Sequence, residues 1–84
     1  MENNFVIFKN PSLRYRKETF GGIAKIILKT FILNKSQYSL INKIEKIIVY
    51  RDLSETEKKI ADKLILEGLL LKVDIERAKE LGFR

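Results

Sequence analysis

The chain has 84 residues, a hydrophobic share of 45% and a formal net charge of +6. It contains neither cysteine nor histidine, which excludes disulfides, thiolate metal sites and the commonest general base and metal ligand. We therefore expect a single domain over residues 1–84 that is not an enzyme, has no catalytic residue, metal or cofactor of its own, and has an acidic partner.

The chain shows no sign of a membrane or export segment. Its longest apolar runs have three or four residues, far fewer than the ~20 that span a bilayer. The opening MENNFVIF begins with an acid and lacks a small-residue cleavage site, unlike a signal peptide. We therefore expect a cytoplasmic protein with no membrane partner.

Strand patterns begin near the N-terminus. Asn4–Phe8 is apolar and β-branched, and the only proline, Pro11, marks a turn after it. Residues 12–20 then alternate between apolar and charged side chains, which predicts a half-buried strand. The alternation places Arg14 and Arg16 together on the exposed face, where they either pair with carboxylates or phosphates or are simply solvated.

A double glycine and a second apolar segment follow. Gly21 and Gly22 indicate a bulge or turn between strands; a phosphate loop is disfavoured because the GK[ST] ending is missing. Residues 23–34 are rich in Ile, Leu and Phe. They form either one long strand or two short strands joined near Leu28 and Lys29, where no Gly, Asn or Asp marks a tight turn.

The second half shows helix patterns. A first helix starts at Asn34 or Ser36, and its apolar stripe continues through Ile44 to Ile48. Residues 47–50 (IIVY) fit either its last turn or a short strand. Ser54–Glu57 has the spacing of a capping box, which predicts the start of a second helix.

That second helix and a third one have clear ends. Gly68 is expected to end the second helix, and residues 69–73 then form a short strand or extended segment. Asp74 caps a final short helix that turns Ile75, Ala78 and Leu81 inward and ends at Gly82. The order of strands first and helices afterwards predicts an α+β fold, winged-helix-like, with a three-stranded antiparallel sheet followed by two or three packed helices.

Lys58, Lys59, Asp62 and Lys63 lie on the polar side of the second predicted helix. In a DNA-binding winged helix this would be the recognition helix. It begins with two glutamates, however, and offers no Arg, Asn or Gln to read base edges. A charged face that contacts only solvent is the simpler interpretation.

Several short segments, taken in serial order, resemble the PqqD-like family, also called the RiPP precursor-peptide recognition element. Members share a charged stretch with Phe-Gly-Gly at the start of the second strand, a third strand ending in Leu-Asn, and a later helix ending in Glu-Gly-Leu-Leu. The matching residues are Arg16, Glu18, Phe20, Gly21, Gly22, Leu33, Asn34, Ser36, Glu67, Gly68, Leu69 and Leu70, within about Leu13 to Leu71. The chain departs from the family between its two main helices, where only Lys46–Leu53 remains for a further helix.

The resemblance implies a non-catalytic, peptide-binding chaperone without a cofactor. Such a domain holds the leader of a ribosomally made precursor peptide for a modifying enzyme, often a radical S-adenosylmethionine enzyme. The leader adds as a strand to the third strand and packs on the later helix, a mode that an exposed sheet edge supports physically. By position, the implied binding residues are Thr30, Phe31, Ile32, Leu33, Lys58, Lys59, Asp62, Lys63 and Leu66.

Two other functions stay open on the sequence. A small winged-helix nucleic-acid-binding protein agrees with the net charge of +6. A dimerisation module is the other, because a second copy would complete both a small core and an open strand.

Overall fold

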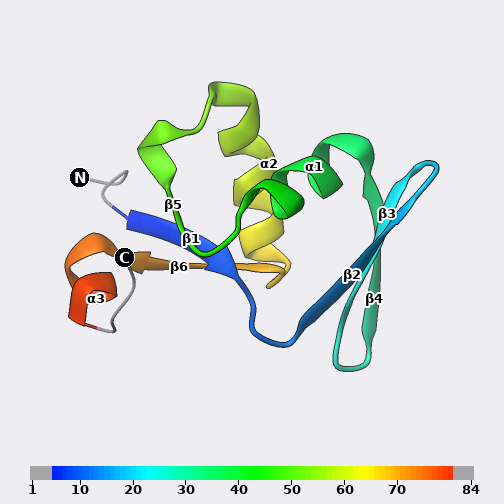
Figure 1. Cartoon of the computed structure of the whole chain (residues 1–84), viewed down its shortest axis with the longest axis horizontal. Coiled ribbons are helices and arrows are strands. Elements are labelled where there is room, and N and C mark those ends of the chain that lie inside the picture. The colour runs from blue at the N-terminus through cyan, green and yellow to red at the C-terminus, as the bar shows by residue number, and fades with distance from the viewer. Residues whose placement is uncertain (1–4, 81–84) are drawn as a thin grey trace.

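The computed structural model describes residues 5–80, which form an α+β fold of two three-stranded antiparallel sheets and three α-helices. The elements in chain order are β1 (Phe5–Lys9), β2 (Leu13–Glu18), β3 (Gly21–Ile26), β4 (Lys29–Asn34), α1 (Lys35–Lys43), β5 (Ile48–Val49), a 3-10 turn η1 (Tyr50–Asp52), α2 (Glu55–Leu66), β6 (Leu70–Asp74) and α3 (Ile75–Glu80). Figure 1 shows the β2–β4 sheet at one end of the molecule and α3 at the other.

The first sheet has the order β2–β3–β4 and is built from two successive hairpins. The charged segment forms β2, and the double glycine starts β3, as predicted. Of the two alternatives for residues 23–34, two short strands are correct, and Ile26 pairs with Lys29 across a two-residue loop. Ile27 opens this loop with a φ of 51°, a conformation that glycine usually supplies.

The second sheet, β5–β1–β6, corrects the expected order of strands followed by helices. β1 is its central strand and pairs antiparallel with β5 and with β6, two strands that lie after α1 and α2 in the chain. The Asn4–Phe8 prediction holds for its described part, Phe5–Phe8. No local pattern indicates that β1 and β6 meet, because the pairing joins segments some 60 residues apart, as with Ile7 and Lys72.

Helix α1 is shorter than its apolar stripe predicts. Asn34, not Ser36, caps it: the Asn34 side chain accepts from the Gln37 N–H, and the Gln37 side chain accepts from the Asn34 N–H, each at 2.8 Å. The helix ends at Lys43, so the helical stripe does not continue to Ile48; of the two alternatives for residues 47–50, the short strand is correct, as β5. The β-branched residues there favour extended backbone, and Ile48 pairs with Ile7 of β1 instead.

The boundaries of α2 agree with the prediction. Ser54 and Glu57 form the expected capping box, with bonds of 3.0 and 3.1 Å. At the other end Gly68 has a φ of 86°, and the Gly68 and Leu69 N–H groups reach back to carbonyls of the last turn. Asp74 caps α3 through the Glu76 N–H; the predicted roles of Leu81 and Gly82 lie outside the described residues.

One hydrophobic core joins both sheets to the helices. Its largest fully buried side chains are Ile7, Leu33, Ile41, Ile44, Leu64, Leu69 and Leu70. Because β4 contributes Leu33 and β1 contributes Ile7, the two sheets share this core although no described strand of one pairs with a strand of the other. None of the helices in residues 5–80 is both long and apolar enough to cross a membrane.

Candidate functional site

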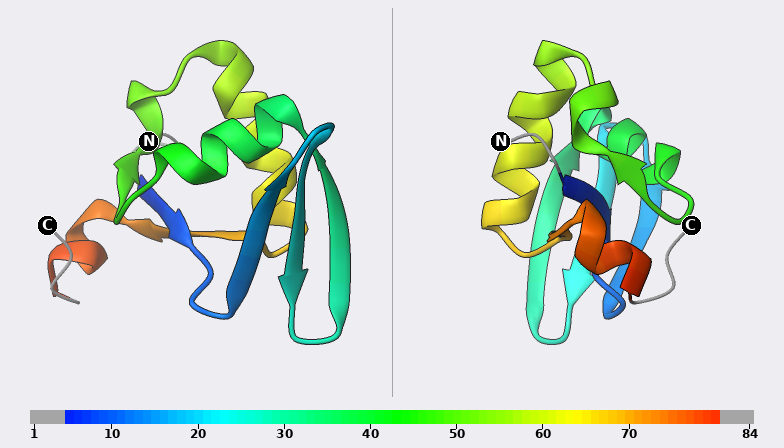
Figure 2. Two further views of the ribbon diagram at one scale, coloured as in Figure 1. Left: turned by 45° about the vertical axis from the view of Figure 1, so that its right-hand side comes forward. Right: turned by 90° about the vertical axis from the view of Figure 1, so that its left-hand side faces the viewer.

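Strand β4 forms a border of its sheet. It pairs with β3 from Lys29 to Asn34, and no other described strand pairs with it. The right-hand view of Figure 2 shows β4 on the side of the sheet where α2 lies. The β4 backbone therefore offers one row of hydrogen-bonding groups to an additional strand.

The pairing register identifies which groups face outward. The loop of Ile27 and Leu28 makes Ile26 and Lys29 the hydrogen-bonded closing pair of the hairpin, and hydrogen-bonded pairs alternate from there. Thr30 and Ile32 therefore direct their backbone N–H and C=O groups away from β3. The Asn34 N–H, next in this alternation, bonds to the Gln37 side chain and not to β3.

A hollow of about 580 Å³ runs along this border, between β4 and α2. It is lined by Phe20, Thr30, Phe31, Ile32, Leu33, Asn34, Gln37, Lys63 and Glu67. Phe20 and Ile32, which line it, are 47% and 69% exposed, and Leu66, one turn after Lys63 on α2, is 87% exposed. Exposed apolar side chains beside an unpaired strand are the surroundings in which an extended peptide binds.

The four predicted β4 residues divide between the two faces of the sheet. Leu33 is fully buried and Phe31 half-buried on the face toward the helices. Thr30 and Ile32 are exposed on the outer face. Of these four residues, Thr30 and Ile32 supply the outward backbone groups of the strand border, while the side chains of the four serve the core and the outer surface separately.

The five predicted α2 residues occupy two flanks of the helix. Lys63 lines the hollow, and Lys59 and Leu66 are exposed one turn before and after it. Lys58 and Asp62 lie on the other flank, around Tyr50: the Lys58 Nζ is 5.6 Å from the ring centroid, and the Tyr50 hydroxyl donates to the Asp62 carboxylate at 2.9 Å. The structure therefore does not bring Lys58 and Asp62 to the strand border.

Four residues of the hollow were not predicted: Phe20, Asn34, Gln37 and Glu67. Glu67 lies one turn after Lys63, so helical spacing would have found it. Asn34 was named as a helix cap and as part of the family resemblance but not as a binding residue, and no sequence pattern singled out Gln37. Phe20 is in the β2–β3 turn, and its place in the hollow depends on how the hairpin packs.

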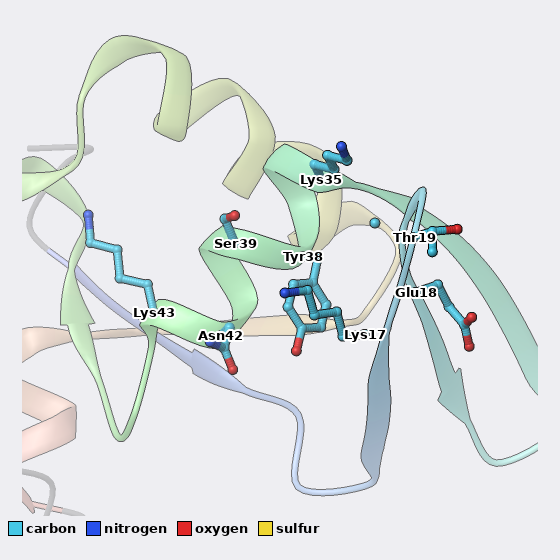
Figure 3. A pocket seen from close by; sticks show the side chains of 9 residues that line it. Lys17, Glu18, Thr19, Lys35, Tyr38, Ser39, Asn42 and Lys43 are labelled. Atoms are coloured by element: carbon cyan, nitrogen blue, oxygen red, sulfur yellow. The ribbon is translucent and has the colours of Figure 1, made fainter.

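A second hollow, of about 600 Å³, lies between the β2–β3 turn and α1 (Figure 3). It is lined by Lys17, Glu18, Thr19, Gly21, Lys35, Tyr38, Ser39, Asn42 and Lys43. Its three lysines do not converge: Figure 3 shows Lys35 and Lys43 at opposite ends of α1, and Lys43 is bonded to Glu57 at 2.8 Å. This arrangement is not suited to hold one anion, nor do residues 5–80 contain a cluster of three possible metal ligands.

The positive charge is unevenly distributed along the chain. Residues 1–44 contain eight Lys or Arg and two Asp or Glu, whereas residues 45–84 contain nine of each. The net charge of +6 therefore belongs to the half that supplies β1, the β2–β4 sheet and α1. An anionic partner would be attracted mainly to that half.

Comparison with known proteins gave no match: neither a protein-family model, nor a curated protein, nor a solved structure is significantly similar to this chain.

Proposed function

We propose that this protein binds an extended peptide as a fourth strand on β4, in the hollow between β4 and α2. The observation that carries the proposal is the unpaired border of β4 together with the hollow beside it, which the exposed side chains of Phe20 and Ile32 line. The backbone groups of Thr30 and Ile32 supply hydrogen bonds to the peptide, and the apolar side chains supply selectivity.

We propose that this peptide is the leader of a ribosomally made precursor. The protein holds it for a modifying enzyme such as a radical S-adenosylmethionine enzyme. Supporting this is the order β2, β3, β4, α1, α2, which agrees with the PqqD-like and winged-helix arrangement that the sequence resembles. In this interpretation β5 and η1 take the place of the family's middle helix. The protein itself performs no chemistry on the peptide.

A binding titration tests the proposal. Fluorescently labelled peptides corresponding to the short open reading frames beside the gene are titrated with the full chain, and fluorescence anisotropy is measured. We expect one of them to saturate with a dissociation constant below ~100 µM, which corresponds to about 5.5 kcal/mol. The absence of any saturable binding in this range would contradict the proposal.

A proline at the border gives a sharper test. In Ile32→Pro the lost N–H faces the open border, so the pairing with β3 stays intact and the protein still folds. Losing that bond and crowding the added strand should weaken peptide binding at least about tenfold. Ile32→Val, which keeps the N–H, is the matched control and should bind normally. Equal affinity in the proline variant and the original chain would place the peptide elsewhere.

The concentration of positive charge in residues 1–44 favours nucleic acid as a second candidate. A salt titration separates the two functions. Binding to a DNA duplex should weaken steeply with salt and almost independently of sequence, whereas binding along a strand border depends less on salt and more on peptide sequence. A second copy paired through β4 would instead show as a concentration-dependent change in mass by light scattering.

A further inference from the structure

Two cations face each other on the outer side of the β2–β4 sheet. Arg14 of β2 is the direct cross-strand partner of Lys25 of β3, and Lys25 is in turn the partner of Thr30 on β4. We call Arg14, Lys25 and Thr30 the cationic row. Like charges directly opposite each other destabilise a sheet, and none of the ion pairs in residues 5–80 includes Arg14 or Lys25. Both residues also line an open hollow of about 480 Å³.

The next row toward α1 has a different chemistry. Arg16 of β2 is the partner of Ile23 on β3, and Ile23 is the partner of Ile32 on β4. The charge of Arg16 is balanced by Glu18, whose carboxylate is 2.6 Å from the guanidinium. On β4 this row therefore ends in the exposed Ile32. The cationic row ends on β4 in Thr30, next to the unbalanced charges of Lys25 on β3 and Arg14 on β2.

We propose that the peptide bound to β4 carries an acidic residue opposite Thr30 and an apolar residue opposite Ile32, and that Arg14 and Lys25 select the acid. The inference rests on the proposed function and names the class of peptide that fits it. Because Thr30 and Ile32 are two positions apart, the peptide must place its acidic and apolar residues two positions apart, with a third residue between them. In an antiparallel peptide the apolar residue comes first, and in a parallel peptide the acid does.

The distances permit this selection. A strand added to β4 lies two strand spacings, about 10 Å, from β3. Thr30, which lies between them, is short, so the flexible stem of Lys25 extends over it toward a carboxylate on the added strand. Arg14 lies one strand further and adds to the field at that position. Side chains directly opposite each other contact across strands, so an apolar residue of the peptide meets Ile32.

A peptide selection tests the inference without requiring the natural ligand. Random twelve-residue peptides are displayed and selected on the immobilised full chain, and the enriched sequences are aligned. We expect an Asp or Glu and a large apolar residue separated by one position. In an enriched peptide, exchanging the acid for lysine should weaken binding about tenfold or more, because like charges then face each other.

A charge reversal assigns the effect to the cationic row. The double variant Arg14→Glu with Lys25→Glu should select lysine or arginine at the same position and keep the apolar residue. Arg77→Glu with Lys79→Glu, an equal change of charge on the exposed surface of α3, is the control and should keep the acid. If circular dichroism shows that the double variant does not fold, the single variant Lys25→Gln is used instead. It should reduce the difference in affinity between the peptide with the acid and the peptide with lysine.

The outcomes separate this inference from the proposed function. The inference is overturned if the enriched peptides lack the pattern, or if the variant with Arg14→Glu and Lys25→Glu still selects an acid at this position. Peptide binding itself stands in both cases. Complete lack of enrichment overturns both. If the original chain binds a labelled DNA duplex and the reversal abolishes that binding without altering peptide selection, the cationic row serves nucleic acid and the inference is wrong.

Discussion

The hydroxyl of Tyr50, in η1, donates a hydrogen bond of 2.9 Å to the carboxylate of Asp62, in α2. The Tyr50 ring is buried and stacks on Phe5 of β1 with ring centroids 4.5 Å apart. This side chain therefore links the second sheet to α2. Asp62, which the family resemblance implied as a peptide-binding residue, is engaged by Tyr50 on a flank of α2 that does not line the hollow.

Tyr50→Phe should lower the free energy of unfolding by about 1 kcal/mol, because it removes this bond and keeps the ring. Burial, and then the bond to Asp62, raise the pKa of Tyr50 above its usual value of 10.0. A raised pKa in the folded state means that the stabilisation is complete below pH 10 and is lost as pH rises through the folded value. Urea unfolding between pH 8 and 11 measures both effects. An equally steep alkaline loss in the variant would contradict this assignment.

Asp62→Asn should leave peptide affinity unchanged, whereas Lys63→Gln should change it. Of these two residues, Lys63 lines the hollow beside β4 and Asp62 does not. The pair is a matched comparison of neighbouring positions on one helix. It is measured by the anisotropy titration described above. A larger effect of the Asp62 variant would show that the peptide lies on the flank of Tyr50.

Glu57→Gln should lose part of its stability at neutral pH. The ammonium of Lys43, at 2.8 Å, and then the Ser54 N–H lower the pKa of Glu57 below its usual 4.5. The stabilisation is therefore present above pH 4.5 and is lost as pH falls through the lower folded value. Because the pair lies at the surface, we expect a difference of at most about 1 kcal/mol at pH 7 that shrinks by pH 3 in urea unfolding. Glu45→Gln, at an exposed residue outside the ion pairs of the described chain, is the control and should leave the free energy of unfolding at pH 7 nearly unchanged.

Gly21→Ala should be far more destabilising than Gly68→Ala. Both glycines have positive φ, 146° and 86°, so alanine is strained at either position. At Gly21 an added Cβ would also collide with the backbone of Leu33 and Asn34, while at Gly68 nothing lies within 4 Å. We expect a loss of about 1 kcal/mol at Gly68 and of more than about 3 kcal/mol, or failure to fold, at Gly21. Thermal unfolding distinguishes them, and similar losses would be inconsistent with close contact between β3 and β4.

Ile27→Asn should stabilise the protein. Ile27 is β-branched, has a φ of 51° and is 73% exposed, so replacing it relieves strain and gives up little burial. A gain of about 1 kcal/mol corresponds to a rise of roughly 4–8 °C in the melting temperature of a domain of this size. Leu28→Asn is the control, because Leu28 is 91% exposed and has no positive φ. Equal shifts for the two variants would mean that side-chain polarity, and not strain, is responsible.

Local chemistry explains why much of the fold was predictable. The capping box of Ser54 and Glu57 acts within four residues, and the alternation around Arg14 and Arg16 acts within one strand. The end of α1 was not predictable in this way. Ile48 satisfies a helical stripe as well as a strand, and its pairing with Ile7, a residue far away in the chain, decides between them.

The candidate site, too, was predictable only in part. The four β4 residues were named through the resemblance to the PqqD-like family, in which the leader adds to the third strand. On α2, helical spacing separates Lys58 and Asp62 from Lys59, Lys63 and Leu66, but the flank that faces β4 depends on how the helix packs. That packing involves η1 and Tyr50, for which the sequence offered no pattern.

The pairing of β1 with β6 has a consequence for biosynthesis. β1 precedes its five-residue partner β6 in the chain by about 60 residues, and β6 ends at Asp74. During translation, β1 must therefore wait for the segments between them before its main partner emerges, whereas the β2–β3–β4 hairpins pair locally as they appear. Nascent chains arrested before residue 70 should consequently show protected hairpin amides and a protease-sensitive β1.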